Sequence, residues 1–150
     1  MMNLILAGAF MAFFTANASP TTTSSTTGTG TSINVQYDTT YDNSAESINS
    51  VSCSDGTNGL GTKGYNTLGA VPGYPLVGAA PTISGWNSAN CGACYSITYA
   101  GTTIYVTAVD AATDSFVLSQ EAMDRLTGNQ AVALGHVTAT YADADASNCA

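Results

Sequence analysis

Basic residues are almost absent from this chain. Only Lys63 and Arg125 stand against ten Asp and Glu residues, so the formal net charge at pH 7 is -8. Nucleic acids and anionic membranes are bound through clusters of lysine and arginine. The composition therefore argues against both as partners. The surface has to be polar through Ser, Thr, Asn, Gly and Tyr, which suits neutral hydrogen-bonding partners such as polysaccharides.

The residues of common catalytic and metal sites are also scarce. His136 is the only histidine, and no G-x-x-x-x-G-K-[ST] phosphate loop occurs. A Ser-His-Asp arrangement would need His136 as its base. This residue alternates with Val137 on an apolar/polar pattern that turns it towards solvent, and it has no ligand-like spacing to the cysteines. We therefore predict no catalytic residue, no metal site and no cofactor.

An apolar run long enough to span a bilayer is missing. The run at Leu4–Phe14 is too short, which argues against membrane insertion. Ala16-Asn17-Ala18 follows it and has the small-x-small form that signal peptidases accept. Although no basic residue precedes the run, we predict that residues 1–18 are a cleaved signal peptide. The mature protein would then be secreted, to the extracellular space or the cell wall.

The segment that follows lacks both charge and large apolar side chains. Residues 19–32 consist of Thr, Ser, Gly and Pro. Such a segment has nothing to bury that would offset its ordering entropy, so we predict a flexible arm. It is either a spacer or a carrier of O-linked sugars, and composition leaves both open. Residues 33–150 are predicted to form a single domain.

The chain has four cysteines, Cys53, Cys91, Cys94 and Cys149. Cys91 and Cys94 form a C-x-x-C sequence, which in a cytosolic protein would suggest a redox or zinc site. In a secreted protein, two structural disulfides are the better interpretation. Four cysteines allow three pairings, and the spacing alone does not choose between them.

Hydrophobic patterns indicate a mainly β protein. Strands are predicted at four places, which are 33–37, 95–99, 104–109 and 137–141. Ala100-Gly101 is a plausible hairpin turn between two of them. One helix is predicted between its N-cap Ser119 and its terminating Gly128. A weaker helical pattern covers 44–51. The Gly- and Pro-rich stretch between Cys53 and Trp86 is predicted to form loops pinned by a disulfide.

Several short sequences together resemble the cerato-platanin family of small fungal secreted proteins. They are Val35-Gln36-Tyr37-Asp38, Cys53-Ser54-Asp55-Gly56, Gly85-Trp86-Asn87, Cys91-Gly92-Ala93-Cys94, Val109-Asp110 with Phe116, and a closing Cys149. The resemblance covers Ile33 to Cys149. This chain departs from it by the Ser/Thr arm, by Tyr95 where many members have Trp, and by Ser115 where Gly is common.

The resemblance implies a fold and a function. The fold is a six-stranded double-ψ β-barrel with one or two short peripheral helices, similar to the first domain of expansins. It implies disulfides from Cys53 to Cys91 and from Cys94 to Cys149. It also implies binding of chitin-type oligosaccharides or other wall polysaccharides, wall loosening without clear hydrolysis, self-assembly at interfaces and elicitation of plant defence, with a plant receptor as a further partner.

Five residues are candidates for binding a glycan. Asp110 ends an apolar strand and resembles the family aspartate that matches the catalytic acid of barrel-type glycosidases, although an Asp in that position is often a turn cap. Tyr37 and Asp38 resemble the family's sugar-binding face. Asn90 offers an amide, or simply forms a turn. Tyr95 could present its ring to a sugar, or pack.

Other aromatic residues and other functions have their own predictions. Trp86 could stack on a sugar, but a single Trp close to a disulfide favours core packing. Tyr65 and Tyr74 are in loops and are expected to pack. A glycoside hydrolase needs two carboxyl groups flanking the bond, and no second partner for Asp110 is evident. A surface-active coat protein is the remaining alternative.

Overall fold

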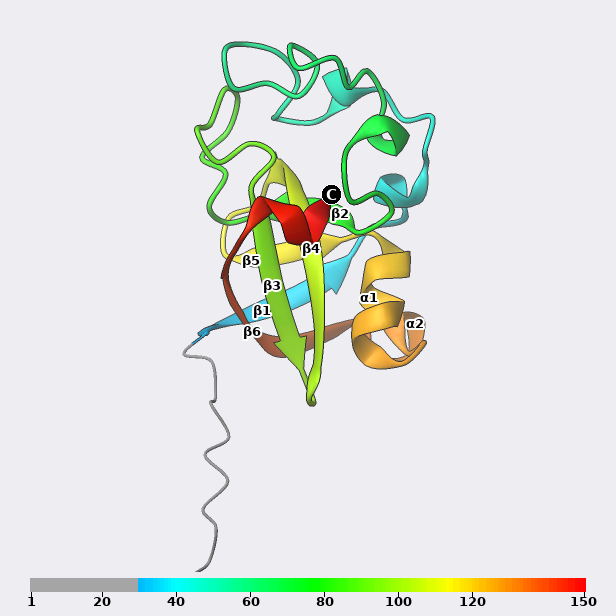
Figure 1. The fold of residues 1–150 in the computed structure, drawn as a ribbon. Helices are drawn as coiled ribbons and strands as arrows, with labels where there is room; N and C mark the ends of the chain where they lie inside the picture. The colour runs from blue at the N-terminus through cyan, green and yellow to red at the C-terminus, as the bar shows by residue number, and fades with distance from the viewer. Residues whose placement is uncertain (1–29) are drawn as a thin grey trace, which may run out of the picture.

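The computed structural model describes residues 30–150. Its strands form a closed barrel in the order β1-β5-β2-β4-β3-β6 (Figure 1). The predicted fold class, a mainly β six-stranded barrel with short helices and two disulfides, is confirmed. The predicted signal peptide and most of the predicted arm lie outside the described residues.

All four predicted strands are present. They are β1 (Thr31–Tyr37), β3 (Cys94–Tyr99), β4 (Thr102–Ala111) and β6 (His136–Ala144). Two further strands have no clear alternating pattern, β2 (Val77–Ala80) and β5 (Ser115–Leu118). β2 lies inside the stretch that we predicted to be loops. β1 pairs in parallel with β5, and β2 pairs in parallel with β4, whereas the other four neighbouring pairs are antiparallel.

The barrel begins earlier than predicted. Thr31 and Ser32 belong to β1, where they pair with Tyr141 and Thr140 of β6. The predicted arm therefore extends too far by these two residues. Their polar side chains are exposed, so apolar periodicity could not reveal that their backbone joins the sheet.

The turn between β3 and β4 is formed as predicted. Ala100 and Gly101 both have positive φ, 46° and 83°. A two-residue hairpin loop of this kind matches the right-handed twist of the flanking strands. In Figure 1 this hairpin points away from the loops that precede β2, which gather at the opposite end of the barrel.

The predicted helix is α1 (Gln120–Thr127), and it packs on one side of the barrel next to the short α2 (Ala131–Leu134). The Ser119 hydroxyl accepts a hydrogen bond from the amide of Ala122 at 3.1 Å, and Gly128 ends the helix in the left-handed conformation. A second cap comes from Asp42, whose carboxylate accepts from the first two amides of α1. Ala122, Met123 and Leu126 are buried as the apolar stripe requires.

The second predicted helix is wrong. Residues 44–51 contain only a 3-10 turn, η2 (Ile48–Ser50). The backbone of this segment pairs instead with a distant loop, because Ile48 N–H donates to Asn66 and Leu68 N–H donates to Glu46. Other 3-10 turns are η1 (Thr39–Asp42), η3 (Leu68–Ala70) and η4 (Ala146–Cys149).

The disulfides pair as the family resemblance implied. Cys53 is bonded to Cys91, 38 residues away, and Cys94 is bonded to Cys149, 55 residues away. The first bridge ties the loop after η2 to the turn before β3. The second bridge fixes the C-terminal η4 to the start of β3. Such cross-links remove conformational freedom from the unfolded chain and so stabilise a small domain.

Candidate functional site

A β-bulge positions Asp110 near the end of β4. The register between β2 and β4 shifts between Gly78 and Ala79, which pair with the residues on either side of Val109. A bulge bends a strand and redirects its side chains. Gly78 is required here because an added Cβ would lie 2.3 Å from the carbonyl oxygen of Val117. The bulge, with Gly78 on the neighbouring strand β2, therefore influences the direction of the Asp110 side chain.

The Asp110 carboxylate accepts four hydrogen bonds. Its Oδ1 receives the backbone amide of Ser52 at 2.8 Å, the Ser52 hydroxyl at 2.6 Å and the amide of Ala111 at 2.8 Å. Its Oδ2 receives the hydroxyl of Tyr41 at 3.0 Å. Asp110 does cap its own strand end through Ala111, and in addition it joins β4 to two loops.

Tyr41 and Ser52 were not among the predicted site residues. Each contacts Asp110 across a long stretch of sequence, 69 residues for Tyr41 and 58 for Ser52. Tyr41 is buried. Burial first, and then the negative charge of Asp110, raise the pKa of Tyr41 well above its ordinary value of 10.0. Its hydroxyl therefore stays protonated and remains a donor to Asp110.

Asp38 and Tyr37 lie next to this group. Asp38 is exposed directly after β1, and its Oδ1 accepts from the amide of Thr40 at 2.8 Å. Hydrogen bonding from Thr40 lowers the pKa of Asp38 below 3.8. The charge of Asp38 also acts on Tyr41, so the two predicted aspartates share this tyrosine as a neighbour. Tyr37 is half-buried and packs against the core.

Asn90 and Tyr95 are linked to each other through Thr82. The Asn90 side-chain amide donates to the Thr82 carbonyl at 2.8 Å, and the Thr82 hydroxyl donates to the Tyr95 hydroxyl at 2.7 Å. Thr82 lies two residues after Ala80, which ends β2 beside Ala111 of β4. The Asn90 amide is therefore at the same end of the barrel as Asp110.

The structure corrects the predicted ring-stacking role of Tyr95. Its side chain is 2% exposed and packs edge-on against Phe116 and Tyr141, with ring centroids 5.6 and 6.1 Å away. Burial raises the pKa of its hydroxyl. No ring face is left for a sugar, because the alternation of β3 turns this residue into the barrel.

The structure also corrects the prediction for Trp86, which is 64% exposed rather than in the core. Its indole N–H donates to Asp55 Oδ1 at 2.5 Å. Cys91, five residues later, is buried, but Trp86 lies in the turn from Gly85 to Ser88 and is exposed. His136 is exposed as predicted.

Comparison with known proteins identifies the family. The cerato-platanin family model matches residues 33–150. The chain belongs to the cerato-platanin family. It is similar to Allergen Asp f 15 of Aspergillus fumigatus, with 56% identity over 79% of this chain and 77% of that protein. It is also similar to the heat-stable 19 kDa antigen of Coccidioides immitis, with 42% identity over 99% and 95% of the two chains.

Solved cerato-platanin structures share the fold. Cerato-platanin 3 from M. perniciosa superposes with a TM-score of 0.76 and 51% identity, covering 79% of this chain and 98% of that one. The solution structure of the fungal elicitor cerato-platanin gives a TM-score of 0.69 and 38% identity, covering 78% and 96%.

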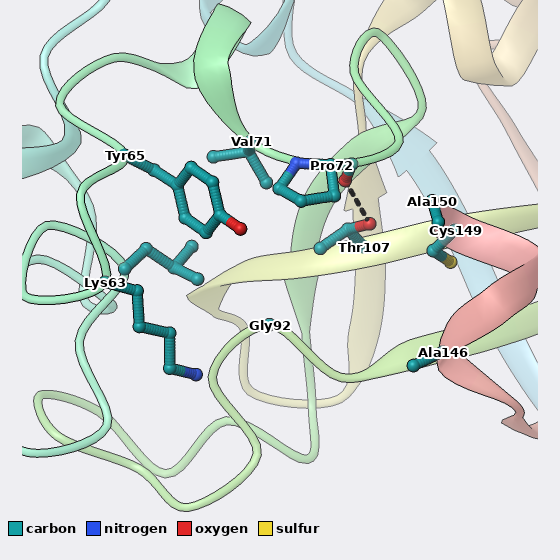
Figure 2. A pocket seen from close by; sticks show the side chains of 10 residues that line it. Lys63, Tyr65, Val71, Pro72, Gly92, Thr107, Ala146, Cys149 and Ala150 are labelled. Atoms are coloured by element: carbon teal, nitrogen blue, oxygen red, sulfur yellow. Dashed lines mark hydrogen bonds between the residues drawn. The ribbon is translucent and has the colours of Figure 1, made fainter.

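A separate pocket lies between the loop after η2 and η4 in this cerato-platanin domain. Its volume is about 290 Å³, and Lys63, Tyr65, Thr107 and Cys149 are among its lining residues (Figure 2). The Thr107 hydroxyl is already used, because it donates to the Pro72 carbonyl at 2.7 Å. None of the five predicted glycan-binding residues lines this pocket.

Within residues 30–150, no group of three His, Cys, Asp or Glu side chains is placed to hold a metal ion. None of the helices in the same residues has both the length and the apolar character needed to cross a membrane.

Proposed function

We propose that this cerato-platanin is a secreted protein that binds chitin-type oligosaccharides or related wall polysaccharides, loosens wall polymers without cleaving them, and elicits plant defence. The observation that carries the proposal is the polar group at one end of the barrel, where Asp110, Asp38 and Asn90 offer acceptors and a donor. The scarcity of basic residues favours a neutral ligand over an anionic one. The description of one structural relative as a fungal elicitor supports the role in defence.

The carboxylates have unused capacity for sugar hydroxyl groups. A carboxylate oxygen can accept about two hydrogen bonds, and Asp110 Oδ2 accepts one, from Tyr41. Asp38 is exposed and accepts one, from Thr40, through Oδ1. Each bond to a sugar would contribute only about 0.5 to 1.5 kcal/mol net. Binding should therefore be weak, and it should act by competing with the hydrogen bonds between polymer strands.

Hydrolysis is less well supported than binding. A glycosidase acid has to donate a proton to the leaving group. The four hydrogen bonds at Asp110 all use it as an acceptor. We therefore propose a non-catalytic role for this residue.

A surface-active coat protein is the second candidate, and one observation favours it. Val132 and Leu134 of α2 are 71% and 37% exposed. Apolar side chains of this kind could drive adsorption at an air–water interface. Film formation that is lost when both residues are changed to serine, with glycan affinity unchanged, would assign that activity to α2.

The proposal is tested by titrating the protein against oligomers of chitin, cellulose and β-glucan in a calorimeter, with an assay for new reducing ends on the same sample. We expect saturable binding to chitin oligomers and no new reducing ends. Reducing ends that accumulate with wild type but not with Asp110→Asn would replace the proposal with a hydrolase. No binding to any of the three oligomers would refute glycan recognition.

A further inference from the structure

Trp86 is exposed, yet it is held in place. Its indole N–H donates to Asp55, and the ideal Cβ position of Gly56 lies 3.1 Å from Trp86 Cζ2. The Asp55 carboxylate and the Gly56 backbone therefore both lie beside the Nε1–Cζ2 edge of the indole. Because 64% of the residue is exposed, ring surface remains open to solvent while one edge is fixed.

The turn that carries Trp86 is braced by a second set of contacts. Asn87 has a positive φ of 58°, and its side-chain oxygen accepts from the amide of Asn58 at 2.9 Å. The Asn58 side chain donates in return to the Asn87 carbonyl at 3.0 Å. Gly56 has φ of 81°, and a Cβ there would lie 2.7 Å from Asn87 Oδ1. Only glycine lets the two loops come this close, and the Cys53–Cys91 disulfide joins them covalently.

We propose that Trp86 and Asp55 form a sugar-stacking subsite, an inference that rests on the proposed glycan binding. An exposed aromatic ring provides a flat apolar surface for the C–H face of a pyranose. The carboxylate at its edge can accept a hydroxyl group of the same sugar. The indole is preorganised, so little conformational entropy is lost on binding.

An apolar protein partner fits this surface less well. Besides Trp86, the large exposed hydrophobic residues among residues 30–150 are Tyr105 on β4 and Val132 and Leu134 on α2. None belongs to the loops around Trp86. A protein-binding hot spot normally sits within a patch of well-packed neighbours, whereas this indole stands beside a carboxylate and asparagines.

The subsite lies close to the Asp110 group along the chain. Ser52 is bonded to Asp110, and Asp55 is only three residues further along. Three residues span at most about 10 Å even when fully extended. A single oligosaccharide could therefore stack on Trp86 while its neighbouring units reach Asp110.

The experiment uses the fact that Trp86 is the only tryptophan. Its fluorescence reports on this subsite alone, and calorimetry reports on binding anywhere. Chitin hexamer is titrated into the mature protein and into Trp86→Ala, Trp86→Phe and Asp55→Asn. Tyr105→Ala is the matched control, because it removes an exposed aromatic ring from the barrel wall.

With wild type, we expect the hexamer to shift the Trp86 emission and to protect it from acrylamide quenching. Trp86→Ala should lose about tenfold in calorimetric affinity, within the range of an aromatic anchor. Trp86→Phe should recover most of that loss, Asp55→Asn should show a smaller loss, and Tyr105→Ala should bind like wild type. Unchanged melting temperatures in all variants would show that the fold is kept.

Two results would overturn the inference in different ways. If calorimetry shows that wild type binds the hexamer, but Trp86 emission is unmoved and Trp86→Ala binds equally well, the subsite is refuted and the proposed function stands. If wild type does not bind the hexamer or the cellulose and β-glucan oligomers, the proposed function fails and the subsite fails with it.

Discussion

Substitution of Asp110 tests whether the candidate site is also a structural joint. Asp110→Ala removes the acceptor of four hydrogen bonds that connect β4 to Tyr41 and Ser52. Each bond contributes about 0.5 to 1.5 kcal/mol net, and water can partly replace the carboxylate as a partner at this half-buried site. We therefore expect the free energy of unfolding to fall by about 3 kcal/mol. For a domain of this size that corresponds to a fall in melting temperature of roughly 10 °C.

Tyr41→Phe provides the partner for a double-mutant cycle. Alone it removes one hydrogen bond, and we expect it to cost about 1 kcal/mol. In the Asp110→Ala background the tyrosine hydroxyl has already lost its acceptor, so its removal should cost nothing or be slightly stabilising. The coupling energy should therefore be about 1 kcal/mol or more, measured by denaturant unfolding followed by circular dichroism.

Asp110→Asn separates folding from binding. The Asn oxygen can still accept from Ser52 and Ala111, and its amide can donate to the Tyr41 hydroxyl, so we expect a loss of only about 1 kcal/mol. The free energy of glycan binding should change by more than the free energy of unfolding, because the charge and acceptor capacity of the carboxylate are lost.

The double-mutant cycle has its own refuting result. If the effects of Tyr41→Phe and Asp110→Ala on the free energy of unfolding are additive within about 0.5 kcal/mol, the proposed hydrogen-bond network is refuted.

The remaining predictions concern stability. Burial raises the pKa of Tyr41 and Tyr95 above 10.0, so as the pH rises the unfolded chain loses these hydroxyl protons before the folded chain does. The free energy of unfolding should therefore stay constant up to about pH 10 and fall above it. A free energy of unfolding that stays constant to about pH 12 in denaturant titrations would contradict this. Asp42→Ala should cost about 1 kcal/mol by removing the cap on the first two amides of α1, and Asp42→Asn should recover part of it in thermal melts. A chain starting at Gly30 should have the same melting temperature as the mature protein. A chain starting at Ile33 should have a lower one, because β1 loses two paired residues. Equal melting temperatures for the two shortened chains would show that those pairs do not contribute to stability.

The strands and the helix that carry a clear periodic pattern or capping residues could be predicted from the sequence. The alternation around Val35 and Ile97 identified β1 and β3, and Ser119 with Gly128 bounded α1. β2 and β5 were missed because four residues such as Val77–Ala80 are too few, and too rich in small residues, to show a period. Their place depends on neighbouring strands, which the sequence does not display.

The candidate site was predicted only in part, for a similar reason. Asp110 could be found because it follows an apolar run, but its partners Tyr41 and Ser52 come from distant loops. The helix predicted over 44–51 does not form, because the backbone of this segment makes hydrogen bonds with the distant loop around Asn66 instead. Trp86 was misplaced because its exposure depends on Asp55 and Gly56, some thirty residues earlier in the chain.

The carboxylates at this end of the barrel serve folding to different degrees, and this determines what their substitution can reveal. Asp42 uses both oxygens to cap α1, and Asp110 holds two loops as well as its own strand end. If Asp42 or Asp110 is replaced and glycan binding falls, the cause can be either a destabilised fold or the loss of a contact with the sugar. Asp38 is exposed and accepts a single local hydrogen bond from Thr40. It is therefore the position among the three at which a contact with sugar is most cleanly separable from the stability of the barrel.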